Sequence, residues 1–360
     1  AYERERFNQR SKTYSDSNLR VMTLWSMYSP SMIVVGSLGS VIILWYGTGE
    51  VLAGTLSVGE LVAFVSYLAL FYVPINQIHS VNHMLQHALA ASERVFEILD
   101  TTPDVADRPG VVRPAGKLRG DVAARHVSFH YRPDIPVLKD VNFEVQAGTR
   151  IALVGPSGAG KSTLIKLLMR FYDVKDGAVM LDGRDLRDLP LAYVREQIGL
   201  VQQEPFLFNG TVKENIAYGD LTAGQARLEE VAQAARAHEF IVELPEKYDT
   251  WIGERGVKLS VGQKQRISIA RVLLKDPPII IFDEATSNID TETEVKIREA
   301  LEELTRNRTT VIIAHRLSTL RHVDRIVVLD GGRLVEEGTH EALLARSGLY
   351  RTLYEAQFQI

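Results

Sequence analysis

The stretch GPSGAGKST, residues 155–163, constrains the fold of this 360-residue chain more than any other. It has the spacing GxxxxGK[ST], follows the apolar run RIALV and precedes the helix-like run TLIKLLMRFY. Glycines in such a loop allow backbone amides to turn inward and form a nest for an anion. We therefore expect a phosphate-binding loop between a strand and a helix, with Lys161 reaching the β- and γ-phosphates of a nucleotide and Ser162 coordinating Mg²⁺.

Three nearly continuous apolar runs, IALVG, IIIFD and TTVIIAH, are typical of strands buried on both faces of a parallel sheet. They predict an α/β domain with a largely parallel sheet over residues 121–360. Two carboxylates end the second run. Asp283 is suited to the Mg²⁺ shell, and Glu284 to a general base that orients or deprotonates an attacking water. An ordinary ion-paired carboxylate is the alternative for Glu284.

The first hundred residues have a different composition. Residues 21–49 and residues 61–92 contain no Asp, Glu, Lys or Arg, and each run is long enough to cross a hydrocarbon core of roughly 30 Å. We predict two membrane spans, at about 21–47 and 58–80, within a helical region over residues 1–100. A pair of buried core helices is the alternative. Basic residues flank both runs and the loop between them is acidic, so the positive-inside rule places both ends in the cytoplasm.

Several residues in this region carry local predictions. Gly36 and Gly39 are expected to allow close helix contact, and Pro74 to kink the second span. Three histidines repeat every four residues and share one helix face: His79, His83 and His87. A metal site is conceivable there, but no Cys, Asp or Glu between residues 61 and 92 completes one. A polar helix face is therefore the favoured interpretation.

Composition indicates a linker between the helical region and the α/β domain, and it also limits which ligands and partners are expected. Residues 101–120 contain Pro103, Pro109 and Pro114 with several glycines and no helical period, so they are interpreted as a linker. The formal net charge of −4 disfavours a nucleic-acid partner, which usually needs a basic face. The absence of cysteine excludes disulfides and thiolate metal sites.

The stretch KLSVGQKQR places Ser260 directly before a helix-like run, which is an N-cap signal, and a helix start of this kind suits an anion. With LSVGQ ahead of Asp283 and Glu284, the chain resembles the ATP-binding cassette (ABC) transporters of the exporter type, in which membrane and ATPase domains are fused. The resemblance implies an α/β P-loop NTPase domain with a helical subdomain, preceded by an all-α partial transmembrane domain. It also implies ATP as ligand, Mg²⁺ as cofactor and ATP hydrolysis coupled to export.

The resemblance assigns roles residue by residue. Tyr131 is expected to stack on adenine, Gln203 to sense Mg²⁺ and the attacking water, and His315 to contact the γ-phosphate. GERG, residues 253–256, matches the segment ahead of the signature. The expected catalytic residues are Glu284, His315, Gln203 and Lys161, and the expected metal ligands are Ser162, Gln203 and Asp283. The other nucleotide contacts are expected from Gly155, Ser157, Gly158, Gly160, Lys161, Ser162, Thr163, Ser260, Gly262, Gln263 and Asp290.

The signature and the loop SNID differ from the family pattern. Val261 replaces the first glycine of LSGGQ, and valine does not adopt a positive φ at low cost. Gly262 remains for close approach to phosphate. Asn288 and Ile289 replace the middle pair of SALD, and Asp290 is kept. We expect a working site, and the departures bear on its affinity and on its coupling to a second site.

In this family the signature helix caps the ATP held by a second subunit, so the resemblance implies a homodimer or heterodimer with another half-transporter. It also implies contact with membrane lipid, no nucleic-acid partner, and a multi-pass location in the plasma membrane with the ATPase domain in the cytoplasm. Six spans per half are usual, so Ala1 is expected to be a truncation point. The transported molecule, whether lipid, drug-like or peptide, is not assigned.

The sequence opposes two alternative functions. A non-transporting ATPase of the same superfamily, acting on nucleic acid or ribosomes, is opposed by the uncharged runs and by the lack of a basic face. A regulatory module that holds ATP without hydrolysing it is opposed by the presence of Glu284.

Overall fold

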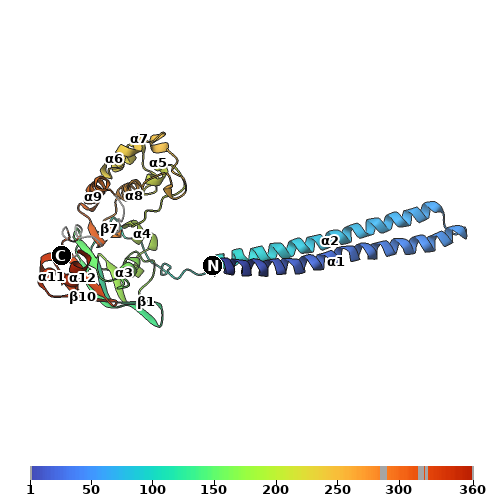
Figure 1. Ribbon diagram of the computed structural model, residues 1–360, viewed down its shortest axis with the longest axis horizontal. Helices are drawn as coiled ribbons and strands as arrows, with labels where there is room; N and C mark the ends of the chain where they lie inside the picture. The colour runs from blue at the N-terminus through green and yellow to red at the C-terminus, as the bar shows by residue number, and fades with distance from the viewer. Residues whose placement is uncertain (1, 284–289, 315–319, 321–322, 359–360) are drawn as a thin grey trace. The chain divides into compact units, whose positions relative to one another are not determined.

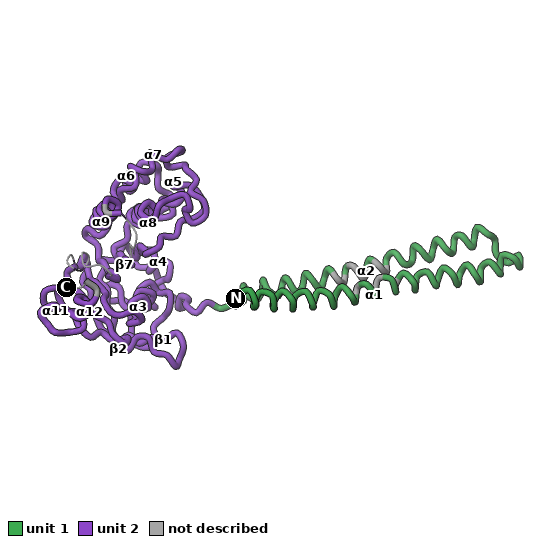
Figure 2. Tube along the Cα trace, in the orientation of Figure 1, with its two compact units in different colours: residues 1–102 green, residues 103–360 purple. Residues whose placement is uncertain are grey.

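A computed structural model describes residues 2–283, 290–314, 320 and 323–358. The chain divides into two compact units, residues 1–102 and residues 103–360 (Figure 2). The first unit is helical and the second has an α/β fold. This agrees with the predicted fold class of a helical region followed by a nucleotide-binding α/β domain.

Unit 1 is a hairpin of two long helices, α1 (Tyr2–Leu52) and α2 (Val58–Leu99), which pack side by side (Figure 1). Ser57 begins α2 with a capping box. Its hydroxyl oxygen accepts the Glu60 backbone N–H at 3.2 Å, and the Glu60 carboxylate accepts the Ser57 N–H at 2.8 Å. These two bonds satisfy donors that a helix start otherwise leaves unpaired, and so fix where α2 begins after the short turn.

Among the described residues, one stretch of at least 18 residues is apolar enough to cross a membrane, Ile33–Leu52. Its 20 residues span about 30 Å as a helix, which matches a hydrocarbon core. A shorter apolar stretch, Val58–Pro74, lies at the start of α2. The first stretch lies nearer the hairpin turn than the predicted span at about 21–47, and the second begins where the predicted span at 58–80 begins and ends before it. Helix α2 continues past Pro74 as one element.

The close contacts between α1 and α2 differ in part from those expected. A Cβ on Gly39 would lie 3.3 Å from the Tyr72 hydroxyl oxygen, so this glycine does face the neighbouring helix. A Cβ on Gly36 would meet nothing within 4 Å among the described residues, so the expected close helix contact at Gly36 is not made between α1 and α2 there. The tightest approach is at Gly47, where a Cβ would lie closer than 3.0 Å to the side chain of Leu61. Small residues therefore face the partner helix toward the hairpin turn.

The larger sheet of unit 2 has six strands in the order β10-β9-β3-β8-β7-β6. Neighbouring strands are parallel except β9 and β10. The three apolar runs singled out in the sequence are the adjacent strands β3, β8 and β7, as a largely parallel sheet requires. The bounds are β3 (Arg150–Val154), β6 (Ile198–Val201), β7 (Ile279–Asp283), β8 (Thr309–Ile313), β9 (Arg325–Asp330) and β10 (Arg333–Gly338).

The smaller sheet is antiparallel, with the order β2-β1-β4-β5. Alternate side chains of the larger sheet enter two different cores, because successive residues of a strand point to opposite faces. In β3, Ile151 and Leu153 pack in the core shared with the smaller sheet, whereas Ala152 and Val154 pack in the core shared with helices. The strands of the smaller sheet are β1 (Val122–Arg132), β2 (Ile135–Val145), β4 (Asp176–Leu181) and β5 (Arg184–Asp185).

The helices of unit 2 fall into groups. In Figure 1, α5, α6 and α7 gather at one end of the unit, with α8 and α9 next to them, and α8 contacts α5, α6 and α9. The described α-helices are α3 (Lys161–Leu168), α4 (Leu191–Glu196), α5 (Val212–Ala217), α6 (Gln225–Ala234), α7 (His238–Glu243), α8 (Val261–Lys275), α9 (Thr291–Thr305), α11 (His340–Ala345) and α12 (Leu349–Phe358). Three 3-10 helices are η1 (Leu186–Asp188), η2 (Lys247–Asp249) and η3 (Glu254–Gly256).

Residues 103–120 form the first segment of unit 2 and have no helix or strand. The guanidinium of Arg170, only 1% exposed, donates to the Ala106 carbonyl oxygen at 3.0 Å. The Lys117 ammonium donates to the carboxylate of Asp276, the residue directly after helix α8, at 2.6 Å. The composition of this segment indicated a loop, and the structure adds that the loop is hydrogen-bonded to the rest of unit 2.

Candidate functional site

The strand order places most of the predicted site at one edge of the larger sheet. Strands β3, β8, β7 and β6 are parallel neighbours, so their carboxyl ends lie together. The phosphate loop follows β3, Asp283 ends β7, and Gln203 comes two residues after β6. In open α/β sheets, ligands bind beyond the carboxyl ends of the strands. Residues far apart in the sequence thus come to one site.

Three glycines give the phosphate loop its path between β3 and α3. Gly155, Gly158 and Gly160 have φ angles of 152°, 81° and 105°, a region that favours glycine. Added side chains would also collide, since a Cβ on Gly155 would lie closer than 3.0 Å to the Leu329 carbonyl oxygen. A Cβ on Gly160 would lie 2.6 Å from a methyl of Leu138. Conformation therefore favours glycine at all three positions, and space also favours it at Gly155 and Gly160.

The Lys161 side chain is held inside the loop. Its ammonium donates to the carbonyl oxygens of Gly155 at 2.7 Å and Pro156 at 2.9 Å. Burial lowers the pKa of Lys161, and the negative charge of Asp283 partly opposes this shift. Burial disfavours the charged ammonium, and an anion bound beside it would offset that cost. Lys161 is thus suited to bind phosphate oxygen.

The chemistry of the predicted metal ligands fits Mg²⁺, which prefers oxygen donors. Ser162 offers an exposed hydroxyl in the first turn of α3, and Asp283 offers a half-buried carboxylate at the end of β7. Gln203 is exposed and offers an amide oxygen. A hydroxyl, a carboxylate and an amide leave room for phosphate oxygens and waters, as is usual for Mg²⁺ sites that bind nucleotides.

The start of the signature helix is as the sequence predicted, because Ser260 is the N-cap of α8. The structure adds a capping box. The Ser260 hydroxyl oxygen accepts the Gln263 N–H at 3.3 Å, and the Gln263 side-chain oxygen accepts the Ser260 N–H at 2.9 Å. Ser260 and Val261 are exposed, the latter by 52%. The helix start is therefore both fixed in geometry and open to a ligand.

Gly262 has a packing role that the sequence did not reveal. It is buried where α8 crosses α9, and a Cβ there would lie closer than 3.0 Å to the methyl carbon of Thr293. The next nearest atoms would be at 3.6 and 3.7 Å, which is ordinary contact. The glycine predicted to approach phosphate is thus also needed for close approach of the two helices within the chain.

Several predicted residues lie outside the described part of the chain: Glu284, Asn288, Ile289 and His315. Asp290 is described and is the N-cap of α9, where its carboxylate accepts the Thr293 N–H at 2.9 Å. That bond lowers the pKa of Asp290. The side chains of His79 and His83 also lie outside the described part, and no group of three potential metal ligands occurs among the residues searched.

Tyr131 lies near the end of β1, and its side chain is 45% exposed. Its hydroxyl is 3.2 Å from the hydroxyl of Thr163, which belongs to the phosphate loop motif and to α3. The structure thus connects the residue predicted to stack on adenine with the helix that follows the phosphate loop. Sequence spacing gave no signal for this contact, because 32 positions separate the two residues.

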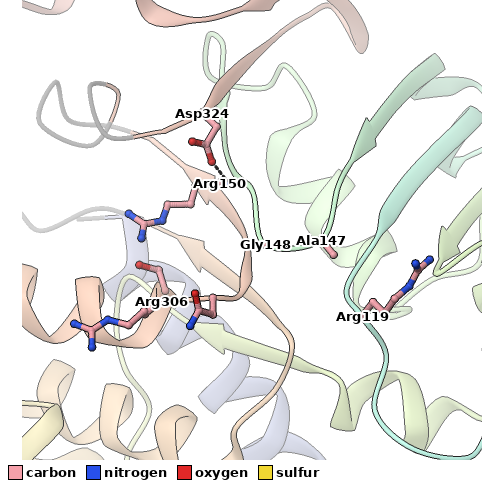
Figure 3. Close-up of a pocket in the computed structure, with 8 residues that line it drawn as sticks. Arg119, Ala147, Gly148, Arg150, Arg306 and Asp324 are labelled. Atoms are coloured by element: carbon pink, nitrogen blue, oxygen red, sulfur yellow. Dashed lines mark hydrogen bonds between the residues drawn. The ribbon is translucent and has the colours of Figure 1, made fainter.

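A separate hollow of about 550 Å³ is lined by residues at the opposite ends of the strands, including Arg150 at the start of β3 (Figure 3). Figure 3 shows the Arg150 and Arg306 side chains extending to one side and Arg119 pointing away. The Asp324 carboxylate accepts the Arg150 backbone N–H at 2.7 Å. Because Arg150 and Gly155 lie at opposite ends of β3, this hollow is not part of the phosphate site.

Two family profiles match the chain. The profile described as ABC transporter matches residues 138–287, which include the phosphate loop, the signature helix and Asp283. The profile described as ABC transporter transmembrane region matches residues 1–75, which include the apolar stretch Ile33–Leu52.

Curated relatives and a solved structure agree. The chain is 46% identical over 359 residues to an ATP-dependent lipid A-core flippase of Syntrophus aciditrophicus, covering 100% of this chain and 59% of the relative. It is 45% identical over 337 residues to a putative multidrug export ATP-binding/permease protein of Staphylococcus aureus, covering 93% and 58%. A bacterial Atm1-family ABC exporter with ATP bound superimposes with a TM-score of 0.85 at 39% identity, covering 99% and 62%.

The chain thus spans about 60% of the length of these relatives. Within that span the similarity runs through both units, and the profile matched over residues 138–287 includes the glycine-shaped loop with Lys161 and, further along the chain, the capped helix α8. The chain therefore belongs to the ABC transporters, and it carries their transmembrane region and their ATP-binding domain in one polypeptide.

Proposed function

We propose that this chain is the ATP-hydrolysing part of a membrane exporter, in which ATP binding and hydrolysis by unit 2 drive transport through a membrane region that includes unit 1. The observation that carries the proposal is the convergence of Lys161, Asp283 and Gln203 at the carboxyl edge of one parallel sheet, in a chain whose residues 1–75 match an ABC transmembrane region. That match favours an exporter over a non-transporting ATPase.

In this proposal the phosphate loop binds the triphosphate, and Lys161 neutralises charge on its β- and γ-phosphates. Ser162, Asp283 and Gln203 would hold Mg²⁺, which supplies further charge neutralisation when bound with nucleotide. Glu284 orients and deprotonates the attacking water, and His315 contacts the γ-phosphate. Because phosphoryl transfer depends mainly on positioning and charge stabilisation, these groups account for the chemistry.

We further propose that the site is shared between two chains, with Ser260, Gly262, Gln263 and Asp290 serving ATP held by a partner half-transporter. The exposed N-terminus of α8 supports this idea, because the field of a helix terminus falls off within about one turn. The partner is either a second copy or a related half-transporter. ATP would then hold two ATPase domains together, and hydrolysis would release them.

The membrane part of the proposal rests on unit 1. Apolar side chains of α1 and α2 are exposed over the stretches Ile33–Leu52 and Val58–Pro74, which would face lipid or other spans. The chain would lie in the plasma membrane with unit 2 in the cytoplasm. The cargo class is left open among lipid, drug-like and peptide molecules; one relative is named for lipid A-core and another for multidrug export.

The test of the enzymatic proposal is ATP hydrolysis by the purified chain in detergent, compared with Glu284→Gln. Removal of a general base typically lowers the rate ~10²–10⁴-fold, while ATP and Mg²⁺ binding should persist. Glu302→Gln is a matched control, because it removes an exposed carboxylate on α9. Full hydrolysis by Glu284→Gln, free of contaminating ATPase, would refute the assignment of the base.

A further inference from the structure

Three aromatic rings meet beside the helix that follows the phosphate loop. Phe129 and Tyr131 lie two positions apart on β1 and so point to the same side of the strand. Tyr172 follows α3. The ring centroids are 5.0 Å apart for Phe129 and Tyr131, 5.2 Å for Tyr131 and Tyr172, and 5.6 Å for Phe129 and Tyr172. We call these three residues the aromatic triad.

The triad extends from the core to the surface. Phe129 is 3% exposed and belongs to the core beneath the smaller sheet, whereas Tyr172 and Tyr131 are 36% and 45% exposed. Tyr131 meets both neighbours at interplanar angles of 85–90°, the edge-to-face arrangement that aromatic pairs prefer. A half-exposed ring would otherwise be free to turn, so these contacts limit the orientations that Tyr131 can adopt.

Two residues of α3 also restrain the Tyr131 side chain. The Thr163 hydroxyl lies 3.2 Å from the Tyr131 hydroxyl, and the Lys166 ammonium lies over the ring, 5.7 Å from its centroid. An ammonium in this position is attracted to the face of the ring. Because Thr163 and Lys166 both belong to α3, a flat ligand that stacks on the exposed part of Tyr131 would meet a ring held in register with the phosphate loop.

We propose that Tyr172 is a positioning residue for the purine base of the nucleotide, and that it acts by holding the Tyr131 ring in an edge-to-face contact. This inference rests on the proposed ATP-binding function. Tyr172 itself does not need to touch the nucleotide. The Tyr172 ring limits the orientations of the exposed Tyr131 side chain, so less side-chain entropy is lost when the base binds.

The expected effect is modest and specific to the base. Loss of one aromatic pair corresponds to a change in affinity of about two- to tenfold. Tyr172→Ala should therefore weaken binding of a non-hydrolysable ATP analogue by about that factor. Binding of inorganic tripolyphosphate with Mg²⁺, which has the phosphates but no base, should not change. Tyr172→Phe keeps the ring and should bind both ligands as the wild type does.

Two further variants separate positioning from general damage. Phe171 is the neighbouring exposed aromatic residue and lies against the Arg195 guanidinium instead of the triad, so Phe171→Ala should leave both affinities unchanged. In a Tyr131→Ala background, Tyr172→Ala should cause no further loss of analogue affinity, since it acts through Tyr131. This second comparison does not depend on tripolyphosphate binding.

The outcomes discriminate clearly. Selective loss of analogue binding, with rescue by Tyr172→Phe and no added effect in the Tyr131→Ala background, supports the positioning role. Unchanged analogue affinity, an equal loss for analogue and tripolyphosphate, or an additive loss in the Tyr131→Ala background overturns it. If the wild-type chain binds neither ligand, the proposed function itself fails, and the role of Tyr172 fails with it.

Discussion

Replacing Gly262 with alanine tests whether this signature glycine is needed for helix packing inside the chain. The new Cβ would overlap the Thr293 methyl carbon, and every other neighbour would be at an ordinary contact distance. Overpacking of this kind costs about 1–3 kcal/mol. Alanine also gains about 0.5–1 kcal/mol over glycine in a helix, so the single substitution underestimates the clash.

Thr293→Ser removes the clashing methyl group and provides the matched background. There, Gly262→Ala should be stabilising by about 0.5–1 kcal/mol, because only the gain in helix propensity remains. The effect of Gly262→Ala should therefore differ between the two backgrounds by about 1–3 kcal/mol.

The assay is thermal unfolding of the purified chain in detergent, with the four variants measured together. For a domain of 150–250 residues, about 1 kcal/mol corresponds to a change in Tm of about 2–4 °C, so the coupling should appear as about 2–12 °C. An equal change in Tm on Gly262→Ala in both backgrounds would refute the packing role, because the clash would then not involve Thr293.

Two further predictions follow from local geometry. Gly155→Ala should weaken ATP binding, because its Cβ would overlap the Leu329 carbonyl oxygen and the phosphate loop would have to move; nucleotide titration with circular dichroism as folding control checks this, and normal affinity would contradict it. Burial raises the pKa of Asp276, but hydrogen bonds from Lys117 and Arg308 outweigh it and keep the pKa below its usual value. Asp276 therefore contributes stability above about pH 3.9 that is lost as pH falls further, so the Tm deficit of Asp276→Asn should shrink in acid. A deficit that does not depend on pH would contradict this.

Local patterns predicted what depends on local structure. The loop before Lys161 and the N-cap at Ser260 follow from residues close together in the sequence, and both lie where expected. The buried strands were recognisable because both of their faces are apolar. The roles of Glu284 and His315 stay predictions, since they rest on the family resemblance and both residues lie outside the described part of the chain.

Contacts between distant segments could not be predicted in this way. Gly262 meets Thr293 across two helices, and Tyr131 on β1 meets Tyr172 in the loop after α3. No periodicity encodes such pairs. The prediction that Gly36 allows close helix contact rests on residue type alone. Which small residues face the neighbouring helix depends on how α1 and α2 pack against each other. In this hairpin Gly47 makes the tightest approach.

The tertiary contacts of residues 103–120 could not be predicted from the sequence either. The prolines and glycines of this segment indicated a loop, and it has no regular structure. Composition gave no sign that Arg170 would be buried and would bind the backbone of Ala106. A lone arginine is usually exposed, and only the tertiary fold supplies the carbonyl groups that satisfy it.

The central claim is that Ser260 completes an ATP site in a partner chain, and nucleotide trapping in mixed dimers tests it most directly. Dimers are purified with two different tags and carry Lys161→Ala and Ser260→Arg either in opposite chains or in the same chain. If the site is shared, opposite chains place both defects in one site and leave the other intact, so one nucleotide is trapped. Both changes in one chain then damage each site once, and none is trapped. Trapping by the second arrangement but not by the first would contradict the account.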